Sequence, residues 1–139
     1  MPRDKTQNTN LAAEFFVASQ LFRLGYAVTI TLGHTKEIDL FVAHPDDRKN
    51  VTIDVKGLKN TTNWPLNPKR KAKDHFYILL SYRNKFGDLT SQPDVFVVPS
   101  LEIERVLSPW SGKPEVTGVG YHRIRSSKYK DAWHLLFQR

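Results

Sequence analysis

Two aspartates lie in the middle of segments that otherwise resemble buried β-strands. Asp39 lies in 38–43 (IDLFVA) and Asp54 in 51–57 (VTIDVKG), where Lys56 follows two residues later. Side chains alternate along a strand, so Asp54 and Lys56 share the face opposite the apolar residues. If the two segments pair as a hairpin, Asp39 and Asp54 can be neighbours on one face. Carboxylates held this close repel each other unless a cation or a proton lies between them, so the pattern suggests a site for a hard metal ion.

A third acid lies on the apolar side of a predicted helix. Segment 8–26 has helical periodicity, with a cap among its first three residues and Gly25 in the position of a C-terminal left-handed cap. Glu14 falls near the middle of the apolar arc, where an unpaired carboxylate is costly. The same sheet face could supply its partner. Alternatively, Glu14 reaches water at the rim of the helix, and Asp54 and Lys56 form a surface charge pair.

The remaining elements follow from periodicity and turn signals. After the helix we expect three consecutive strands, a polar and basic connection over 57–74 in which Asn67-Pro68 can open a short helix, and two further strands. The five expected strands are 26–31, 38–43, 51–57, 75–83 and 94–100. A short helix is expected over 100–110, and a short strand followed by a helix over 121–138. This order predicts an α/β fold with a mixed central sheet of about five strands flanked by helices.

Composition narrows the class of protein. The chain has 139 residues, which is typical of one domain. It has no cysteine, which excludes disulfides, zinc–thiolate sites and thiol nucleophiles. No apolar segment has the length of a membrane span or a secretory h-region, so a cytoplasmic protein without a membrane partner is expected. The net charge of +7 favours polyanionic partners, because neutralising phosphates releases condensed counterions.

The order of these acids resembles the PD-(D/E)XK nuclease superfamily, whose restriction-endonuclease-like fold is shared with archaeal Holliday-junction resolvases. Glu14 in LAAEFFVASQLFRLGY is similar to the helix glutamate of that family, and Asp39 in EIDLFV to its first metal-binding aspartate. IDVKG supplies Asp54 and Lys56 at the Asp/Glu-x-Lys motif. The resemblance covers residues 8–100, within a single domain over 1–139, and leaves 101–139 as a C-terminal extension.

The resemblance implies a metal-dependent endonuclease that hydrolyses phosphodiester bonds in DNA, including structured or branched DNA. Mg²⁺, or Mn²⁺, would be held by Asp39 and Asp54 with the backbone carbonyl of Val55 beside them. Lys56 would position the attacking water and stabilise negative charge. Glu14 would bind a second metal ion or the water shell of the first. A homodimer is expected by the same resemblance, since cutting two strands needs two sites.

Contacts with nucleic acid are expected from the basic connection. The candidate residues are the cations of that segment and one tryptophan placed to stack on a base or ribose: Lys59, Trp64, Lys69, Arg70, Lys71 and Lys73. A second basic cluster has weaker grounds and comprises Arg123, Arg125, Lys128 and Lys130. Three alternatives stay open: RNA as substrate, a non-catalytic binding or assembly module of the same fold, and an unrelated α/β domain with a basic surface.

Overall fold

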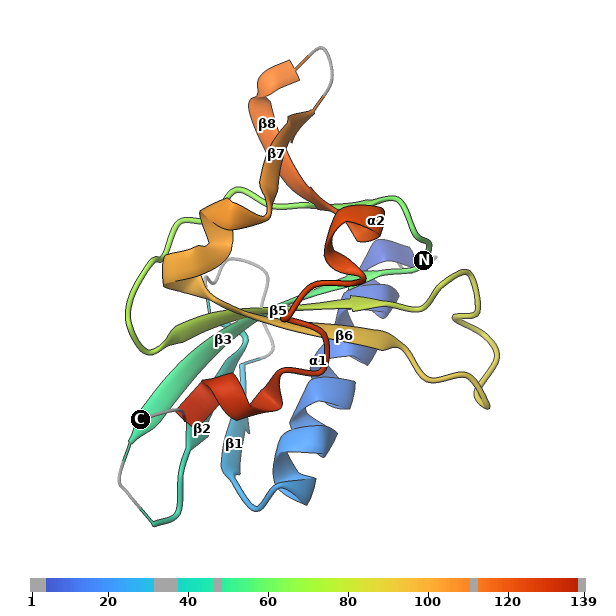
Figure 1. The fold of residues 1–139 in the computed structure, drawn as a ribbon. Helices are drawn as coiled ribbons and strands as arrows, with labels where there is room; N and C mark the ends of the chain where they lie inside the picture. The colour runs from blue at the N-terminus through green and yellow to red at the C-terminus, as the bar shows by residue number, and fades with distance from the viewer. Residues whose placement is uncertain (1–4, 32–37, 47–48, 111–112, 138–139) are drawn as a thin grey trace.

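The computed structural model describes residues 5–31, 38–46, 49–110 and 113–137. The strands and helices are distributed along this part of the chain as follows: α1 (Lys5–Arg23), β1 (Ala27–Ile30), β2 (Leu40–Ala43), β3 (Asn50–Leu58), β4 (Asn63–Pro65), β5 (His75–Ser81), β6 (Asp94–Pro99), the 3₁₀ helix η1 (Ser100–Arg105), β7 (Leu107–Trp110), β8 (Lys113–Gly120), α2 (Tyr121–Ile124) and the 3₁₀ helix η2 (Trp133–Phe137) (Figure 1). Within these ranges no helix combines the length and hydropathy needed to cross a bilayer.

The central sheet has five strands in the order β1-β2-β3-β5-β6. Strands β3 and β5 are parallel, whereas the other neighbouring pairs are antiparallel. Helix α1 lies along this sheet, as Figure 1 shows, and contacts mainly β3 and β1. The predicted mixed α/β fold with a five-stranded sheet flanked by helices is therefore confirmed.

The two faces of the central sheet are buried by different elements. On one face, Val17 of α1 packs in a cluster with Ile53 and Val55 of β3, and with apolar residues of β5, β6 and η2. On the other face, a second cluster joins Tyr77 of β5 to residues of β4, β6, β8 and α2. Asp54 and Lys56 alternate with Ile53 and Val55, so their side chains leave β3 on the face opposite α1.

Helix α1 begins earlier in the chain than its apolar pattern predicts. It is already helical at Lys5, so Asn10, one of the expected caps, lies inside it. Its C-terminal end agrees with the sequence, because Gly25 has a φ of 90°, the left-handed conformation that favours glycine. The earlier start lets Asn10 contact β3, where its side-chain oxygen accepts a hydrogen bond from the Gly57 N–H at 3.2 Å.

The C-terminal part of the chain differs from the prediction. A second sheet, in the order β4-β8-β7, packs beside the second core cluster. The helix expected over 100–110 ends after η1, and β7 follows it; the strand and helix expected over 121–138 are replaced by α2 and η2. The connection after Asn67-Pro68 contains no helix. Segment 113–120 (KPEVTGVG) has low strand propensity, and it is a strand because it pairs with β7, just before it in the chain, and with the distant β4.

Gly57 marks the closest approach between α1 and β3. A Cβ atom there would lie 2.8 Å from the Thr9 carbonyl oxygen and 3.1 Å from Ala13 Cβ. We expect Gly57→Ala to push α1 away from the sheet and to lower the free energy of unfolding by about 1–3 kcal/mol. Urea unfolding checks this, with Gly87→Ala as control because its Cβ would meet nothing within 4 Å. Equal stability of the two variants would contradict the prediction.

Candidate active site

The candidate site lies where β2 and β3 separate. Among the described residues, β2 pairs with Asn50–Ile53 only, so in this part of the chain the rest of β3 has an open edge on that side. The Asp39 N–H donates to the Ile53 carbonyl at 2.8 Å, and one Asp39 carboxylate oxygen accepts a hydrogen bond from the Val55 N–H at 2.7 Å. Asp39 thus takes the place of the missing strand partner for Val55. N–H and C=O of one strand residue point to the same side, so the Val55 carbonyl also faces this edge.

Thr31 fixes the chain before Asp39 from its other side. Its N–H donates to the Asp39 carbonyl at 2.9 Å, and its hydroxyl lies 2.7 Å from the Ile38 carbonyl oxygen and 3.0 Å from that of Asp39. Both backbone polar groups of Asp39 are therefore bonded, as is one oxygen of its carboxylate. The Asp39 side chain is therefore held by the surrounding strands, before any ligand binds, at the point where β2 and β3 separate, which we call the fork.

The predicted proximity of Asp39 and Asp54 is confirmed. Leu40 is paired with Ile53, which places the preceding Asp39 opposite Asp54 on the same face. The Asp39 carboxyl lies near enough to raise the pKa of Asp54. Lys56 lies on this face too, with its Nζ 3.6 Å from an Asp54 oxygen. Only 14% of the Asp54 side chain is exposed, against 39% for Lys56, so the carboxylates lie beneath a partly solvated ammonium group.

Burial dominates the electrostatics of this group. It raises the pKa of Asp54 from 3.8 to about 8; the Lys56 charge lowers that pKa, and the hydrogen bond and charge of Asp39 raise it. With a pKa of about 8, the Asp54 carboxyl carries a proton at neutral pH in the metal-free chain. A divalent cation would replace that proton, because it neutralises both carboxylates at once.

The donor set fits a hard metal ion. Asp39, Asp54 and the Val55 carbonyl present oxygen atoms at one edge of β3. Mg²⁺ commonly takes one or two carboxylates from the protein and completes its shell with water and substrate phosphates. Within the described ranges, no group of three or more histidines, cysteines or acids gathers as a metal site. The residues present therefore favour a site built on two carboxylates.

Glu14 approaches this edge from the other face of the sheet. It is 7% exposed and lies one helical turn after Asn10, whose side chain reaches the open edge of β3 at Gly57. Residues four apart lie on the same helix face, so Glu14 borders the same edge. It does not form a three-carboxylate cluster with Asp39 and Asp54 in the described part of the chain. Its role as a metal ligand stays a prediction.

His75 belongs to this neighbourhood, and sequence reasoning missed it. It is 1% exposed at the start of β5, paired with Thr52, and its Nδ1 lies 2.7 Å from the Thr52 hydroxyl. Burial and the Arg70 charge lower the pKa of His75 to about 4, against the opposing effect of Asp39. The imidazole is therefore neutral at physiological pH. No local signal indicates this placement, because it depends on the parallel register between β3 and β5.

The basic connection is anchored beside the site. The Tyr77 hydroxyl donates to the Arg70 carbonyl at 2.8 Å, and Tyr77 is paired with Asp54. Four residues of the connection that are predicted to contact nucleic acid are exposed: Lys69, Arg70, Lys71 and Lys73. Lys71 forms an ion pair with Glu104. Lys59 is half-buried, with its Nζ 5.1 Å from the centre of the Phe86 ring. Their contact with nucleic acid stays a prediction.

Trp64 requires a correction. It is 1% exposed, its indole N–H donates to the Leu80 carbonyl at 3.0 Å, and its ring packs against Phe96 and Tyr121. The prediction that Trp64 stacks on a base is wrong. Trp64 follows a run of polar residues in the sequence, but pairing between β4 and β8 places its ring in the second core cluster.

Comparison with known proteins supports the fold. No protein-family model and no curated protein matches the chain. Among solved structures, the bacterial homing endonuclease I-Ssp6803I superposes with a TM-score of 0.59 at 16% sequence identity, over 97% of this chain and 95% of that one. Over almost its entire length, this chain therefore has the fold of a solved homing endonuclease.

Proposed function

We propose that this protein is a metal-dependent DNA endonuclease of the PD-(D/E)XK type. The observation that carries the proposal is the arrangement at the fork of β2 and β3, where Asp39 lies opposite Asp54 on one face and Lys56 Nζ lies 3.6 Å from an Asp54 oxygen. Burial raises the pKa of Asp54 to about 8, and a divalent cation bound between the two carboxyl groups would replace its proton. A purely structural sheet has no need of such a pair.

Each residue of the candidate site has a separate role in the proposed phosphodiester hydrolysis. Asp39, Asp54 and the Val55 carbonyl would hold Mg²⁺ or Mn²⁺. That ion supplies an electrophile for the phosphate oxygens and lowers the pKa of a bound water. Lys56 orients the attacking water and places a positive charge beside the developing negative charge. Glu14 supports the water shell or a second ion from the α1 side.

DNA is the proposed substrate on two grounds. The net charge of +7 favours a polyanion, and the structure with the same fold is that of a homing endonuclease. The exposed cations beside Tyr77, from Lys69 to Lys73, would contact phosphates near the site. A homodimer would present two such sites to the two strands of a duplex.

The test is a cleavage assay with labelled duplex, single-stranded and four-way-junction DNA, and RNA, in Mg²⁺, Mn²⁺ or EDTA. We expect metal-dependent cleavage that Asp39→Asn reduces by at least about 10²-fold. Asparagine still accepts the Val55 N–H, so the fork keeps its hydrogen bond. Asp46→Asn, in the exposed turn after β2, is the matched control. Binding without cleavage, unchanged by Asp39→Asn, would instead indicate a non-catalytic binding module.

A further inference from the structure

The small sheet β4-β8-β7 has one face buried and one face bare. Trp64 of β4 and Leu107 of β7 are both paired with Val119 of β8, and these three side chains pack in the second core cluster. Their alternating neighbours point the other way. On that outer face, Gly118 and Gly120 leave the C-terminal end of β8, the middle strand, without side chains.

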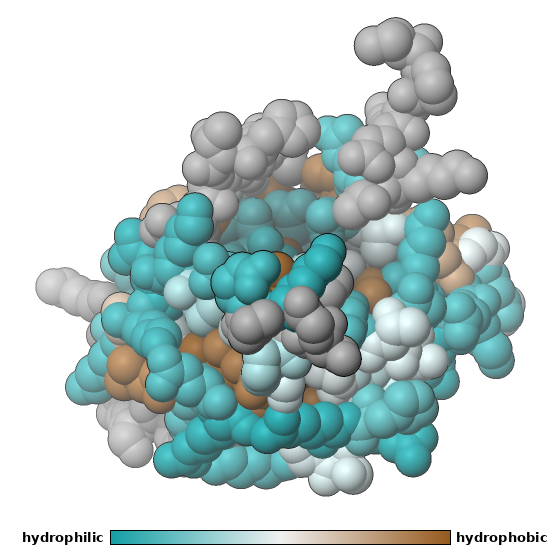
Figure 2. Space-filling view, turned by 90° about the horizontal axis from the view of Figure 1, so that it is seen from above, coloured by the Kyte–Doolittle hydropathy of each residue, from teal (hydrophilic) through white to brown (hydrophobic). Residues whose placement is uncertain are grey.

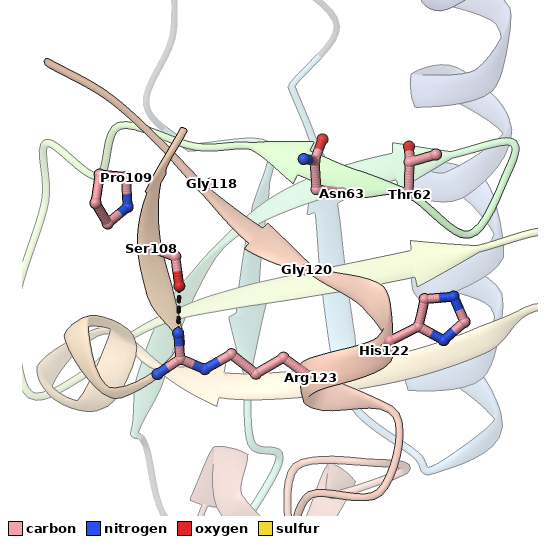
Figure 3. Close-up of a pocket in the computed structure, with 8 residues that line it drawn as sticks. All are labelled: Thr62, Asn63, Ser108, Pro109, Gly118, Gly120, His122 and Arg123. Carbon is pink, nitrogen blue, oxygen red and sulfur yellow. Dashed lines mark hydrogen bonds between the residues drawn. The ribbon is translucent and has the colours of Figure 1, made fainter. Parts of the chain in front are cut away.

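The outer face forms the floor of an open cleft of about 630 Å³. Asn63 of β4 is paired with Gly120, and Ser108 of β7 with Gly118, so an amide and a hydroxyl flank the bare strand. Arg123, on α2, reaches across this floor and donates a hydrogen bond to the Ser108 hydroxyl (Figure 3). The cleft is lined by these residues together with Thr62, Pro109 and His122, and no carboxylate is among the described lining residues.

Each feature of this cleft suits an extended polyanion. A glycine inside a strand often marks a place where a ligand or another backbone approaches closely. Guanidinium, amide and hydroxyl groups are the side chains that most often donate to phosphate oxygens. Arg123 is exposed, and its bond to the Ser108 hydroxyl leaves guanidinium N–H groups for a ligand, since arginine has five N–H donors.

From this geometry we infer that the glycine-floored cleft binds the phosphodiester backbone of the nucleic-acid substrate, as a site separate from the carboxylates on β3. The inference rests on the proposed function, because it names a second contact of the same substrate. The cleft has a fixed place relative to the cutting site: β4 follows β3 after four residues, and the Tyr121 N–H at the end of β8 donates to the Thr62 carbonyl at 3.0 Å.

The test measures binding of labelled duplex DNA in EDTA over a range of salt concentrations. Arg123→Gln removes the charge and is expected to weaken binding about tenfold, and to lower the slope of log K against log salt by about 0.9. Gly120→Val changes no charge but fills the floor. A Cβ at Gly120 would meet only Arg123 Cβ, at 3.9 Å, so the position has room for a side chain, and weaker binding by the folded variant would show that the cleft is blocked. Thermal unfolding of both variants verifies folding.

Arg23→Gln is the matched control, because Arg23 is exposed at the end of α1 far from the β7–β8 hairpin in Figure 1. It should bind DNA like the unaltered protein. Wild-type affinity in both cleft variants would overturn the inference, even where metal-dependent cleavage supports the proposed function. If both cleft variants bind DNA more weakly but the unaltered protein never cleaves DNA, the result would support DNA binding by the cleft and reject the proposed nuclease activity.

Discussion

Replacing Lys56 by methionine should lower the rate of DNA cleavage by about 10²- to 10³-fold, the loss typical of removing one charge-stabilising donor from a transition state. Methionine keeps an unbranched side chain on the same face of β3 but has no ammonium group beside Asp54. The measurement is the single-turnover cleavage rate at saturating DNA and Mg²⁺. Lys85→Met, in the exposed loop after β5, removes the same charge elsewhere and should cut at the unaltered rate.

Loss of Lys56 has a second effect that the experiment must separate. The Lys56 charge lowers the pKa of Asp54, so Lys56→Met should raise the fraction of Asp54 that is protonated at neutral pH. Saturating Mg²⁺ should displace that proton in both proteins, because the ion neutralises the carboxylates that bind it. A Lys56→Met cleavage rate that equals the unaltered rate at saturating Mg²⁺ and raised pH would contradict a direct role for Lys56 in the chemical step.

In the metal-free protein, the contribution of Asp54 to the free energy of unfolding should fall as the pH rises from about 4 to about 8, the reverse of an ordinary ion-paired carboxylate. The pKa of Asp54 is about 8 in the folded chain against 3.8 ordinarily, so the folded state binds a proton more tightly than the unfolded state. This contribution is complete below the unfolded pKa and is lost as the pH passes through the folded pKa. Its slope cannot exceed about 1.4 kcal/mol per pH unit for one proton.

His75 changes the free energy of unfolding with the opposite sign over part of this pH range. Its pKa is lowered to about 4 in the folded chain, so its contribution is complete above its ordinary value of 6.5 and is lost as the pH falls toward 4. The two contributions are separated by comparing the protein with Asp54→Asn, which retains His75. The difference in unfolding free energy between them, measured by urea denaturation in EDTA, should change steadily with pH.

Saturating Mg²⁺ should stabilise the unaltered protein above about pH 8, where Asp54 has lost its proton, and should stabilise Asp54→Asn less, because that variant lacks one of the two carboxylates that would bind the cation. Asp88→Asn is the control, since Asp88 lies in an exposed loop and its pKa is lowered by hydrogen bonds from Thr90. A pH profile of Asp54→Asn parallel to that of the unaltered protein would show that Asp54 is not protonated at neutral pH in the folded chain.

The central sheet and the pairing of Asp39 with Asp54 were both predictable from the sequence. Strand alternation in 51–57 and the short turn after β2 define a local hairpin, and in a hairpin the register sets which side chains are opposite. The same alternation places Lys56 beside Asp54. These contacts join residues close in the chain, so periodicity and turn chemistry are sufficient to find them.

Other parts of the site depend on contacts between distant segments. The parallel register of β3 with β5 places His75 against Thr52, and pairing of β4 with β8 across more than fifty residues buries Trp64. The position of Glu14 relative to the fork depends on how α1 crosses β3 at Gly57. Local propensity carries no information about these pairings, because each is stabilised by burial of surfaces contributed by several elements.

By itself, then, the sequence determined the elements of the central sheet and the group formed by Asp39, Asp54 and Lys56. Only the tertiary structure decided that Trp64 is a core residue, that His75 is neutral beside the site, and that glycines of β8 line an open cleft. The physical reason is the range of the interactions. Alternation and turns act between neighbours in the chain, whereas burial and the pKa changes it causes depend on every element that packs around a side chain.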